Sequence, residues 1–265
     1  MNNIIRLFIF LLAGCSLTLA TSCEGVFGGI YNENKGSDIN VKAGQLYINA
    51  TSWTDWYYID LDSLEEIING GDAAALLKAQ TVFTPWPIPQ TEDTEAARDN
   101  SGMYTYWFDI FGKGMSNYER RGYTPTAPQP EPEHWTFAVH RDNVRTNGGC
   151  VYETDFTSMD DLPASATAFS DKTFTADTWS ERDVWVNREQ MLNCIMGNQG
   201  ININQVLSSW LTFNIPPIPP TYTFNNHVFI LRTKEGEYFA LQLQSYMNDQ
   251  GTTCYLTINY KKLAP

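Results

Sequence analysis

Alternation of apolar and polar residues is clearest near the C-terminus. The segments HVFILRT, YFALQLQSY and CYLTINYK are separated by Lys234–Gly236 and by Asn248–Thr252, which are rich in turn-forming residues. This arrangement predicts three antiparallel strands in meander order. Because residues two apart on a strand face the same side, the last segment has one apolar face that we expect to be buried. That face is made of Cys254, Leu256, Ile258 and Tyr260.

Further strands are predicted upstream. Residues 46–61, LYINATSWTDWYYIDL, hold aromatic and β-branched residues on both sides of a polar turn at Thr51–Asp55, which indicates two strands. Residues 103–112 are typical of a buried aromatic strand. Residues 134–156 predict a strand, a turn at Gly148–Gly149 and another strand. The chain is therefore mainly β in character.

Helical spacing of apolar residues occurs in two places. Asp62–Gln80 has this spacing but is divided by Gly70–Gly71, so we expect two short helices. Arg188–Met196 predicts another helix, whose apolar stripe ends before Gly197. Prolines favour extended loops between the predicted strands, because proline cannot occupy a central strand. These are Pro85, Pro87, Pro89, Pro125, Pro128, Pro130 and Pro132.

The N-terminal segment is typical of export. Residues 1–22 have one charge near the start and then an apolar run too short to span a membrane, which predicts a signal peptide. Small residues precede both Cys15 and Cys23, as in bacterial lipoproteins. We favour lipidation of Cys23, because Cys15 leaves a very short hydrophobic stretch before it. Cleavage without lipid is the alternative. Residues 23–45 then predict a flexible tether, and residues 46–265 the folded domain.

Charge and motifs exclude several functions. Acidic residues outnumber basic ones 30 to 17, giving a net charge of -13, which argues against nucleic acid as a partner. The common catalytic and nucleotide-binding motifs are absent, so we expect no catalytic residues and no enzyme activity. The cysteines beyond the anchor have no metal-binding spacing and form at most one disulfide, or else pack as small apolar residues. They are Cys150, Cys194 and Cys254.

Residues 134–149, HWTFAVHRDNVRTNGG, resemble the HmuY family of haem-binding outer-surface lipoproteins, whose members carry a W-[DT]-x-A-x-H-R-x-x-V-R-x-N strand followed by glycines. Residues 47–61, 210–232 and 238–261 resemble other strands of that family, in the same order. Residues 62–133, with the helical pair and the prolines, lie outside the pattern and indicate an enlarged member.

The resemblance implies an all-β, mostly antiparallel, hand-shaped fold with a few short helices inserted, in which haem is held between a thumb-like and a finger-like element. Family members supply two axial ligands, both His or both Met. The second ligand position falls on Ile215, which cannot coordinate iron. The first region maps onto REQMLNCIMG, where Met191 or Met196 would serve; core packing is the other interpretation of each. We expect His140 and Arg141 to be structural.

The implied pocket is lined by four further candidates: Trp210, Ile215, Pro216 and Tyr222. Haem could bind through one methionine, through a different second ligand, or through apolar contacts alone. No metal other than haem iron is expected.

The resulting hypothesis is a lipid-anchored outer-membrane protein, exposed at the surface, that captures haem or a related porphyrin and passes it to an outer-membrane transporter. The main alternative is a surface lipoprotein that binds carbohydrate or peptide for a nutrient importer, with tryptophan and tyrosine stacking on sugar rings. A third alternative is an adhesin or assembly subunit.

Overall fold

The structure is a computed structural model that describes residues 41–89, 103–109, 119–187, 195–214 and 221–265. The predicted signal peptide, most of the predicted tether, and Cys23, Met191, Ile215 and Pro216 lie outside these residues. Val41–Pro265 forms one unit. The folded part begins before Leu46, because the Lys42 carbonyl accepts hydrogen bonds from the backbone of Gln45 and from the side chain of Gln80. The last residues of the predicted tether therefore belong to the domain.

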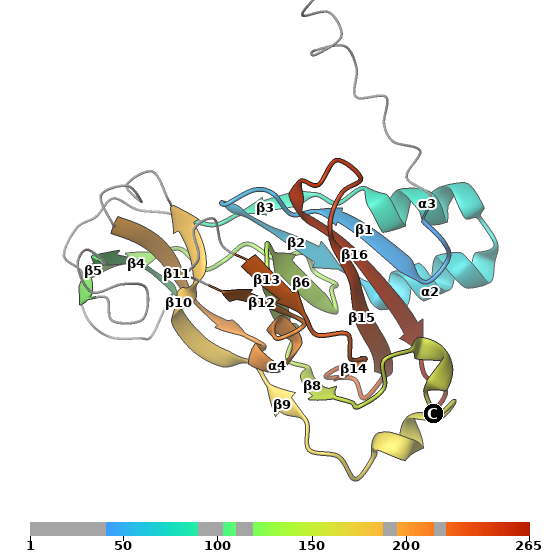
Figure 1. Ribbon diagram of the computed structural model, residues 1–265. Helices are drawn as coiled ribbons and strands as arrows, with labels where there is room; N and C mark the ends of the chain where they lie inside the picture. The colour runs from blue at the N-terminus through green and yellow to red at the C-terminus, as the bar shows by residue number, and fades with distance from the viewer. Residues whose placement is uncertain (1–40, 90–102, 110–118, 188–194, 215–220) are drawn as a thin grey trace, which may run out of the picture. The chain divides into compact units, whose positions relative to one another are not determined.

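The largest sheet has six strands and contains the predicted C-terminal meander (Figure 1). Its order is β1 (Gln45–Asn49), β16 (Thr253–Lys262), β15 (Tyr238–Met247), β14 (Phe229–Arg232), β8 (Cys150–Glu153) and β9 (Thr175–Ala176). All neighbours are antiparallel. Burial in β16 alternates as predicted, with Cys254, Leu256, Ile258 and Tyr260 inside.

A second, four-stranded sheet has the order β3 (Pro85–Pro87), β2 (Asp55–Ile59), β6 (Phe137–His140) and β7 (Asn143–Thr146). The two strands predicted around Thr51–Asp55 are confirmed as β1 and β2, although they belong to different sheets. Pro85 and Pro87 were expected in a loop but form the edge strand β3, where a missing N–H is tolerated. The strand predicted before Gly148–Gly149 is a tight hairpin of β6 and β7.

The remaining strands form two hairpin-based sheets. One has the order β10 (Thr178–Asn187), β11 (Ile195–Ile203), β4 (Met103–Asp109) and β5 (Glu119–Thr126), and the other pairs β12 (Leu211–Asn214) with β13 (Thr221–Phe224). Residues 195 and 196, predicted to end a helix, instead begin β11. Pro125, predicted in a loop, lies in the edge strand β5.

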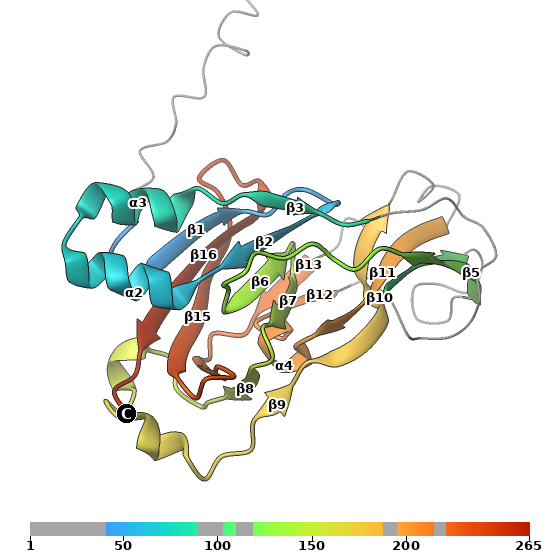
Figure 2. The ribbon, with the colours of Figure 1, turned by 180° about the vertical axis from the view of Figure 1, so that it is seen from behind.

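The predicted helical pair is confirmed as α2 (Leu61–Gly70) and α3 (Ala73–Thr81), which lie beside β1 (Figure 2). Asp60 and Asp72 cap the two helices by accepting backbone N–H bonds. Gly71 ends α2 with φ 72°, a left-handed conformation that glycine adopts easily. The other helices are short: α4 (Gln205–Ser208), η1 (Met159–Asp161) and η2 (Ala166–Phe169). Among the residues described, no helix is long and apolar enough to cross a membrane.

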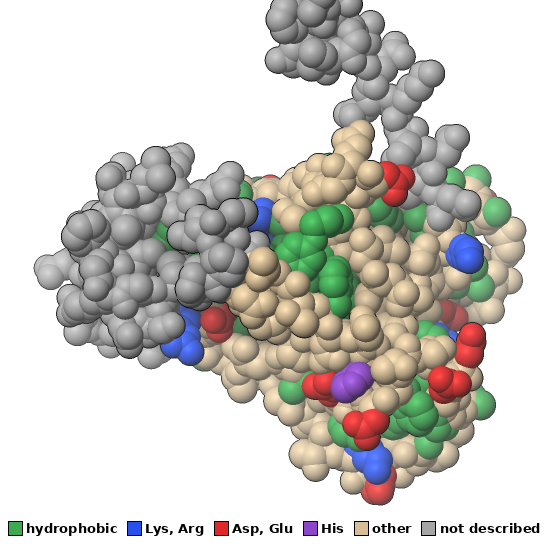
Figure 3. Space-filling model, in the orientation of Figure 1, with side chains coloured by type: hydrophobic (Ala, Val, Ile, Leu, Met, Phe, Trp, Pro, Cys, Tyr) green, Lys and Arg blue, Asp and Glu red, His purple; other side chains and the backbone are tan. Residues whose placement is uncertain are grey.

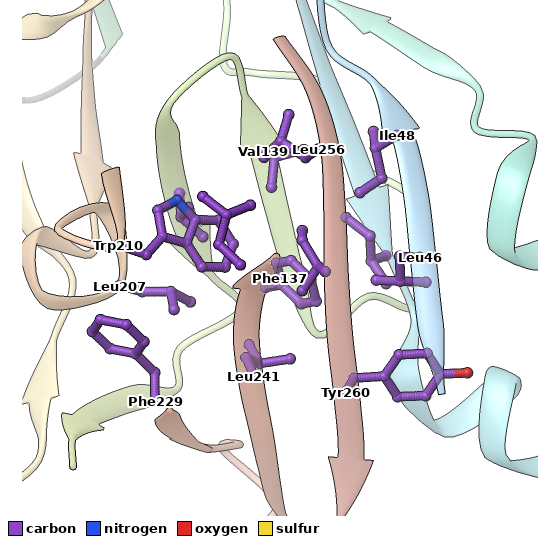
Figure 4. Packing of buried hydrophobic residues seen from close by; sticks show 14 of the residues in the cluster. Leu46, Ile48, Phe137, Val139, Leu207, Trp210, Phe229, Leu241, Leu256 and Tyr260 are labelled. Atoms are coloured by element: carbon purple, nitrogen blue, oxygen red, sulfur yellow. The ribbon is translucent and has the colours of Figure 1, made fainter. Parts of the chain in front are cut away.

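The main hydrophobic core lies between the six-stranded sheet and the β2–β6–β7 strands (Figure 4). Leu46 and Ile48 from β1 and Leu256 from β16 face Phe137 and Val139 from β6 across this core. A second cluster contains Trp56, Trp135 and Val184 and joins the β2 sheet to the β10–β11 hairpin. The architecture is mostly antiparallel β with a few short helices, as predicted.

Candidate ligand-binding site

The HRDN turn (His140–Asn143) joins β6 to β7 and lies beside the candidate site. His140 is buried, and its Nε2 atom lies 3.0 Å from the Trp53 carbonyl, to which it donates. Its Nδ1 atom has no hydrogen-bond partner within the described part of the chain. Burial lowers the pKa of His140 to about 4, so the ring is neutral at pH 7. A neutral, enclosed ring fits the structural role expected for His140.

Arg141 forms the top of a stack of planar groups. It adopts φ 55°, and its Nη1 atom donates to the Thr51 carbonyl at 2.8 Å. The guanidinium lies 3.6 Å from the centre of the Trp53 ring, and Trp53 stacks on Trp185 with ring centres 6.4 Å apart. Arg141 thus has the structural role expected from the sequence, and it holds Trp53 against the β10–β11 hairpin.

Asp142, the next residue of the turn, is partly buried. Burial raises the pKa of its carboxyl from 3.8 to about 6, Arg141 opposes this rise, and Asp183 on β10 adds to it. The fully buried Tyr246 is near enough that Asp142 helps to raise the pKa of its phenol. The turn therefore adjoins both β10 and β15.

The β12–β13 hairpin packs on β15 through an aromatic cluster, which we define as Phe213, Tyr222 and Phe224 of the hairpin and Tyr246 of β15. Tyr222 is central, with its ring centre 6.2 Å from Phe213, 5.5 Å from Phe224 and 5.8 Å from Tyr246. Phe213 is 36% exposed. Hydrophobic side chains gather on this face of the molecule in the region of β12, β13 and β16 (Figure 3). The cluster thus presents apolar rings at the surface.

Three of the predicted site residues, Tyr222, Trp210 and Met196, lie in the described part of the chain, whereas Met191, Ile215 and Pro216 lie outside it. Tyr222 lies in the aromatic cluster, partly exposed as a pocket wall requires. Trp210 is fully buried in the main core, and its Nε1 atom lacks a partner among the residues described. Met196 is 2% exposed on β11. Trp210 and Met196 therefore lie in the interior of the domain.

The sequence interpretation missed the other members of the site. Phe213, Phe224, Trp53 and Trp185 were not singled out, although alternation in LTFN and TYTF would have placed Phe213 and Phe224 on strands flanking residues 215–220. Nothing local in the sequence indicates that Trp53 meets Trp185. Their contact depends on the pairing of distant strands.

Other candidate chemistry is weak. His227 Nδ1 lies 2.8 Å from a Glu153 carboxylate oxygen, and His134 is largely exposed. No three His, Cys, Asp or Glu side chains converge on a metal position within the described ranges. Cys254 is buried and Cys150 partly buried, both as free thiols.

Residues of the HmuY-like segment 134–149 connect β7 to β2 and to the residues that precede β6. Arg145 pairs with Glu131 at 2.7 Å, donates to the Tyr58 hydroxyl at 3.3 Å and lies 5.0 Å from the Trp135 ring centre. Asn147 donates to the Trp135 carbonyl at 2.9 Å. The motif therefore builds the frame from which the hairpins project.

Comparison with known proteins gives a consistent assignment. No curated protein matches the chain. The structure is similar to a Bacteroides vulgatus ATCC 8482 protein described as HmuY-like and haem-binding, with 27% identity, TM-score 0.55, and coverage of 82% of this chain and 89% of that one. A Bacteroides fragilis NCTC 9343 protein described as a lipoprotein has 26% identity and TM-score 0.55, covering 82% of this chain and 86% of that one.

The fold is also shared with an apo HmuY analogue of Tannerella forsythia, at 18% identity and TM-score 0.56, covering 85% of this chain and 100% of that one. A model of the HmuY family matches residues 52–260, which include most of the domain and all strands of the candidate site. The chain belongs to the HmuY family.

Proposed function

We propose that this chain binds haem or a related porphyrin and delivers it to an outer-membrane transporter, acting as a binder without turnover. The observation that carries the proposal is the aromatic cluster, in which Phe213, Tyr222 and Phe224 of the β12–β13 hairpin contact one another and Tyr246 of β15. Ile215 and Pro216 follow β12 directly in the sequence, outside the described residues, and we propose them as further pocket walls.

Apolar contact supplies most of the affinity in this proposal. Burying several hundred Å² of porphyrin at about 25 cal/mol per Å² gives enough free energy for useful binding before iron ligation. The partly exposed rings lose little side-chain conformational entropy on binding, because they are already packed against one another. Phe213 is exposed and Tyr222 and Phe224 are partly exposed, so these three members of the cluster have surface to offer, whereas Tyr246 is buried.

Iron ligation then determines selectivity. Met191 and Met196 are the proposed ligands, because thioether sulfur binds haem iron and Ile215 offers no donor atom. Met191 lies between β10 and β11 in the sequence, outside the described residues, whereas Met196 is buried at the start of β11. Met196 can ligate iron only if this end of β11 rearranges, so we favour Met191.

The anchor and the location are part of the same proposal. Lipidation of Cys23 would attach the domain to the outer membrane, where a surface-exposed protein can meet haem and a transporter. Metabolic labelling with a fatty acid, in wild type against Cys23→Ala and Cys15→Ala, tests the anchor. Label that persists in Cys23→Ala would overturn this assignment.

Haem titration tests the binding proposal. The Soret and Q bands of ferric and ferrous haem are recorded with wild type, Met191→Ala, Met196→Ala and Phe213→Ala, and Met159→Ala on η1 serves as a methionine control. We expect bands with wild type, altered bands with Met191→Ala, weaker binding with Phe213→Ala and no change with Met159→Ala. Absence of any spectral change with wild type in either redox state would refute haem binding.

Carbohydrate binding is the second candidate, favoured by the Trp53–Trp185 stack and by the exposed Trp179, at 37%. Flat indole faces stack on sugar rings. Quenching of tryptophan fluorescence by an oligosaccharide, lost in Trp179→Ala, would support this function in place of haem capture.

A further inference from the structure

Two adjoining hollows lie beside α2. One is lined by α2, the end of α3 and β3, and the other by α2, residues 133–136 and the turn at residues 233–235. The first hollow, of about 310 Å³, is mainly apolar and lies between α2, the end of α3 and Trp86 of β3. Its apolar lining includes Leu64, Ile67, Val82 and Phe83. The second, of about 350 Å³, is polar. They share Asp60, Ser63 and His134, so they form one groove, here named the helical groove.

The apolar half is open to solvent. Val82 at the end of α3 is 65% exposed. Leu77 of α3 is 45% exposed but does not line the groove. Exposed apolar surface rimmed by polar residues is typical of a protein interaction site.

The polar half carries an excess of negative charge. Its carboxylates are Asp60, Asp62, Glu66, Glu133 and Glu235. Lys234, 3.8 Å from Glu235, and Lys262, 3.2 Å from Asp62, offset part of this charge. Glu66 is exposed on α2. The remaining charge favours a cationic partner.

The spacing of these carboxylates decides which cation fits. Among the residues described, no three acidic or histidine side chains converge on one point as a metal ion requires. Separate carboxylates beside an apolar hollow instead match separate lysine or arginine side chains that flank a bulky apolar one. A nucleic acid or an anionic membrane would be repelled by the same charges.

We propose that the helical groove docks a basic, apolar peptide segment of a partner protein, with an apolar side chain over Ile67 and Phe83 and basic side chains against Glu66 and Glu133. None of the residues that line the groove belongs to β10, β11, β12 or β13. The partner therefore binds without displacing a ligand held by the hairpins, and this inference does not depend on which ligand they hold.

Fluorescence anisotropy with the purified protein tests the proposal. The probe is a short fluorescein-labelled peptide of leucine and lysine, compared with the same peptide carrying glutamate in place of lysine. Val82→Gln and Glu66→Lys alter the two halves of the groove at exposed positions, so both variants should fold. Leu77→Gln and Asp171→Lys are their controls, with matched changes of polarity and charge outside the groove.

We expect the lysine peptide to bind the wild-type protein. Each groove variant should lower the affinity for this peptide by roughly tenfold, about 1.4 kcal/mol, while the control variants should bind it like wild type. Salt near 1 M, where the Debye length is about 3 Å, should also weaken it. If Asp171→Lys lowers the affinity for the lysine peptide as much as Glu66→Lys does, the attraction comes from the overall charge of the protein and the proposal is overturned. Binding of the glutamate peptide, or no binding of either peptide, would overturn it as well.

Discussion

Replacing Asp142 with asparagine is expected to change how the stability of the domain depends on pH. The HRDN turn contains two titrating groups whose pKa values move in opposite directions: burial raises that of Asp142 from 3.8 to about 6 and lowers that of His140 from 6.5 to about 4. Each pKa unit corresponds to about 1.4 kcal/mol, so each group contributes a pH-dependent free energy of unfolding of about 3 kcal/mol.

The two contributions have opposite signs. Between pH 4 and 6 the folded state keeps the proton on Asp142 whereas the unfolded state has lost it, so this group lowers stability as pH rises. Over nearly the same interval the unfolded state protonates His140 and the folded state does not, so the histidine raises stability as pH rises. The two slopes nearly cancel in the wild-type protein.

Replacing either Asp142 or His140 should make the pH dependence contributed by the other residue measurable. Asp142→Asn should become more stable, relative to wild type, by about 3 kcal/mol between pH 4 and pH 7, apart from any constant difference. His140→Gln, whose amide can still donate to the Trp53 carbonyl, should lose about 3 kcal/mol relative to wild type between pH 4 and pH 6.5. Only the change with pH matters, so a constant cost of either substitution does not affect the comparison.

Urea unfolding followed by tryptophan fluorescence at pH 4, 5, 6 and 7 measures these differences. Asp171→Asn is the control, because this side chain is 76% exposed, and its difference from wild type should stay flat. Parallel pH curves for Asp142→Asn and wild type would refute the raised pKa of Asp142. The same result for His140→Gln would refute the enclosed, neutral histidine.

Four further substitutions test the helix caps and the packing of the frame. Asp60→Ala and Asp72→Ala each remove a helix cap and should lower the free energy of unfolding by about 1 kcal/mol, which urea unfolding would measure; no loss in either would contradict the capping geometry. Leu207→Ala opens a cavity in the main core and should cost about 2–5 kcal/mol, seen as a lower unfolding midpoint at unchanged m-value, and a loss below that range would mean that the site collapses. Gly149→Ala places a Cβ 2.8 Å from the Arg232 carbonyl oxygen and should cost about 1–3 kcal/mol; a melting temperature equal to wild type would show that no backbone shift is needed.

Local signals predicted much of the fold. The alternation in residues 253–262 and the paired glycines at 70 and 71 act over a few neighbours, and both predictions are confirmed. The predicted helix at residues 188–196 was wrong at its described end, because β11 is buried on both faces and so lacks alternation. Asn198 and Gln199 look like loop residues in the sequence but are buried in β11. Gln199 accepts a bond from Trp56 and donates one to Gln129.

The site was less predictable for a physical reason. Trp210 and Tyr222 have the same aromatic signal in the sequence, yet one packs in the core and the other reaches the surface. Which of them is exposed depends on how the β12–β13 hairpin sits against β15, and strand pairing over such distances leaves no local pattern. The stack of Arg141 on Trp53 is equally non-local.

The pairing of β1 with β16 joins the first strand of the domain to the last, since Gln45 lies opposite Asn259. β16 is also an inner strand of the sheet, flanked by β1 on one side and β15 on the other. The largest sheet therefore cannot be completed until the final residues have emerged from the ribosome or from a translocation pore. This pairing delays completion of the sheet until β16 has been made, so strands that lie far apart in the sequence must wait for one another before the core can close.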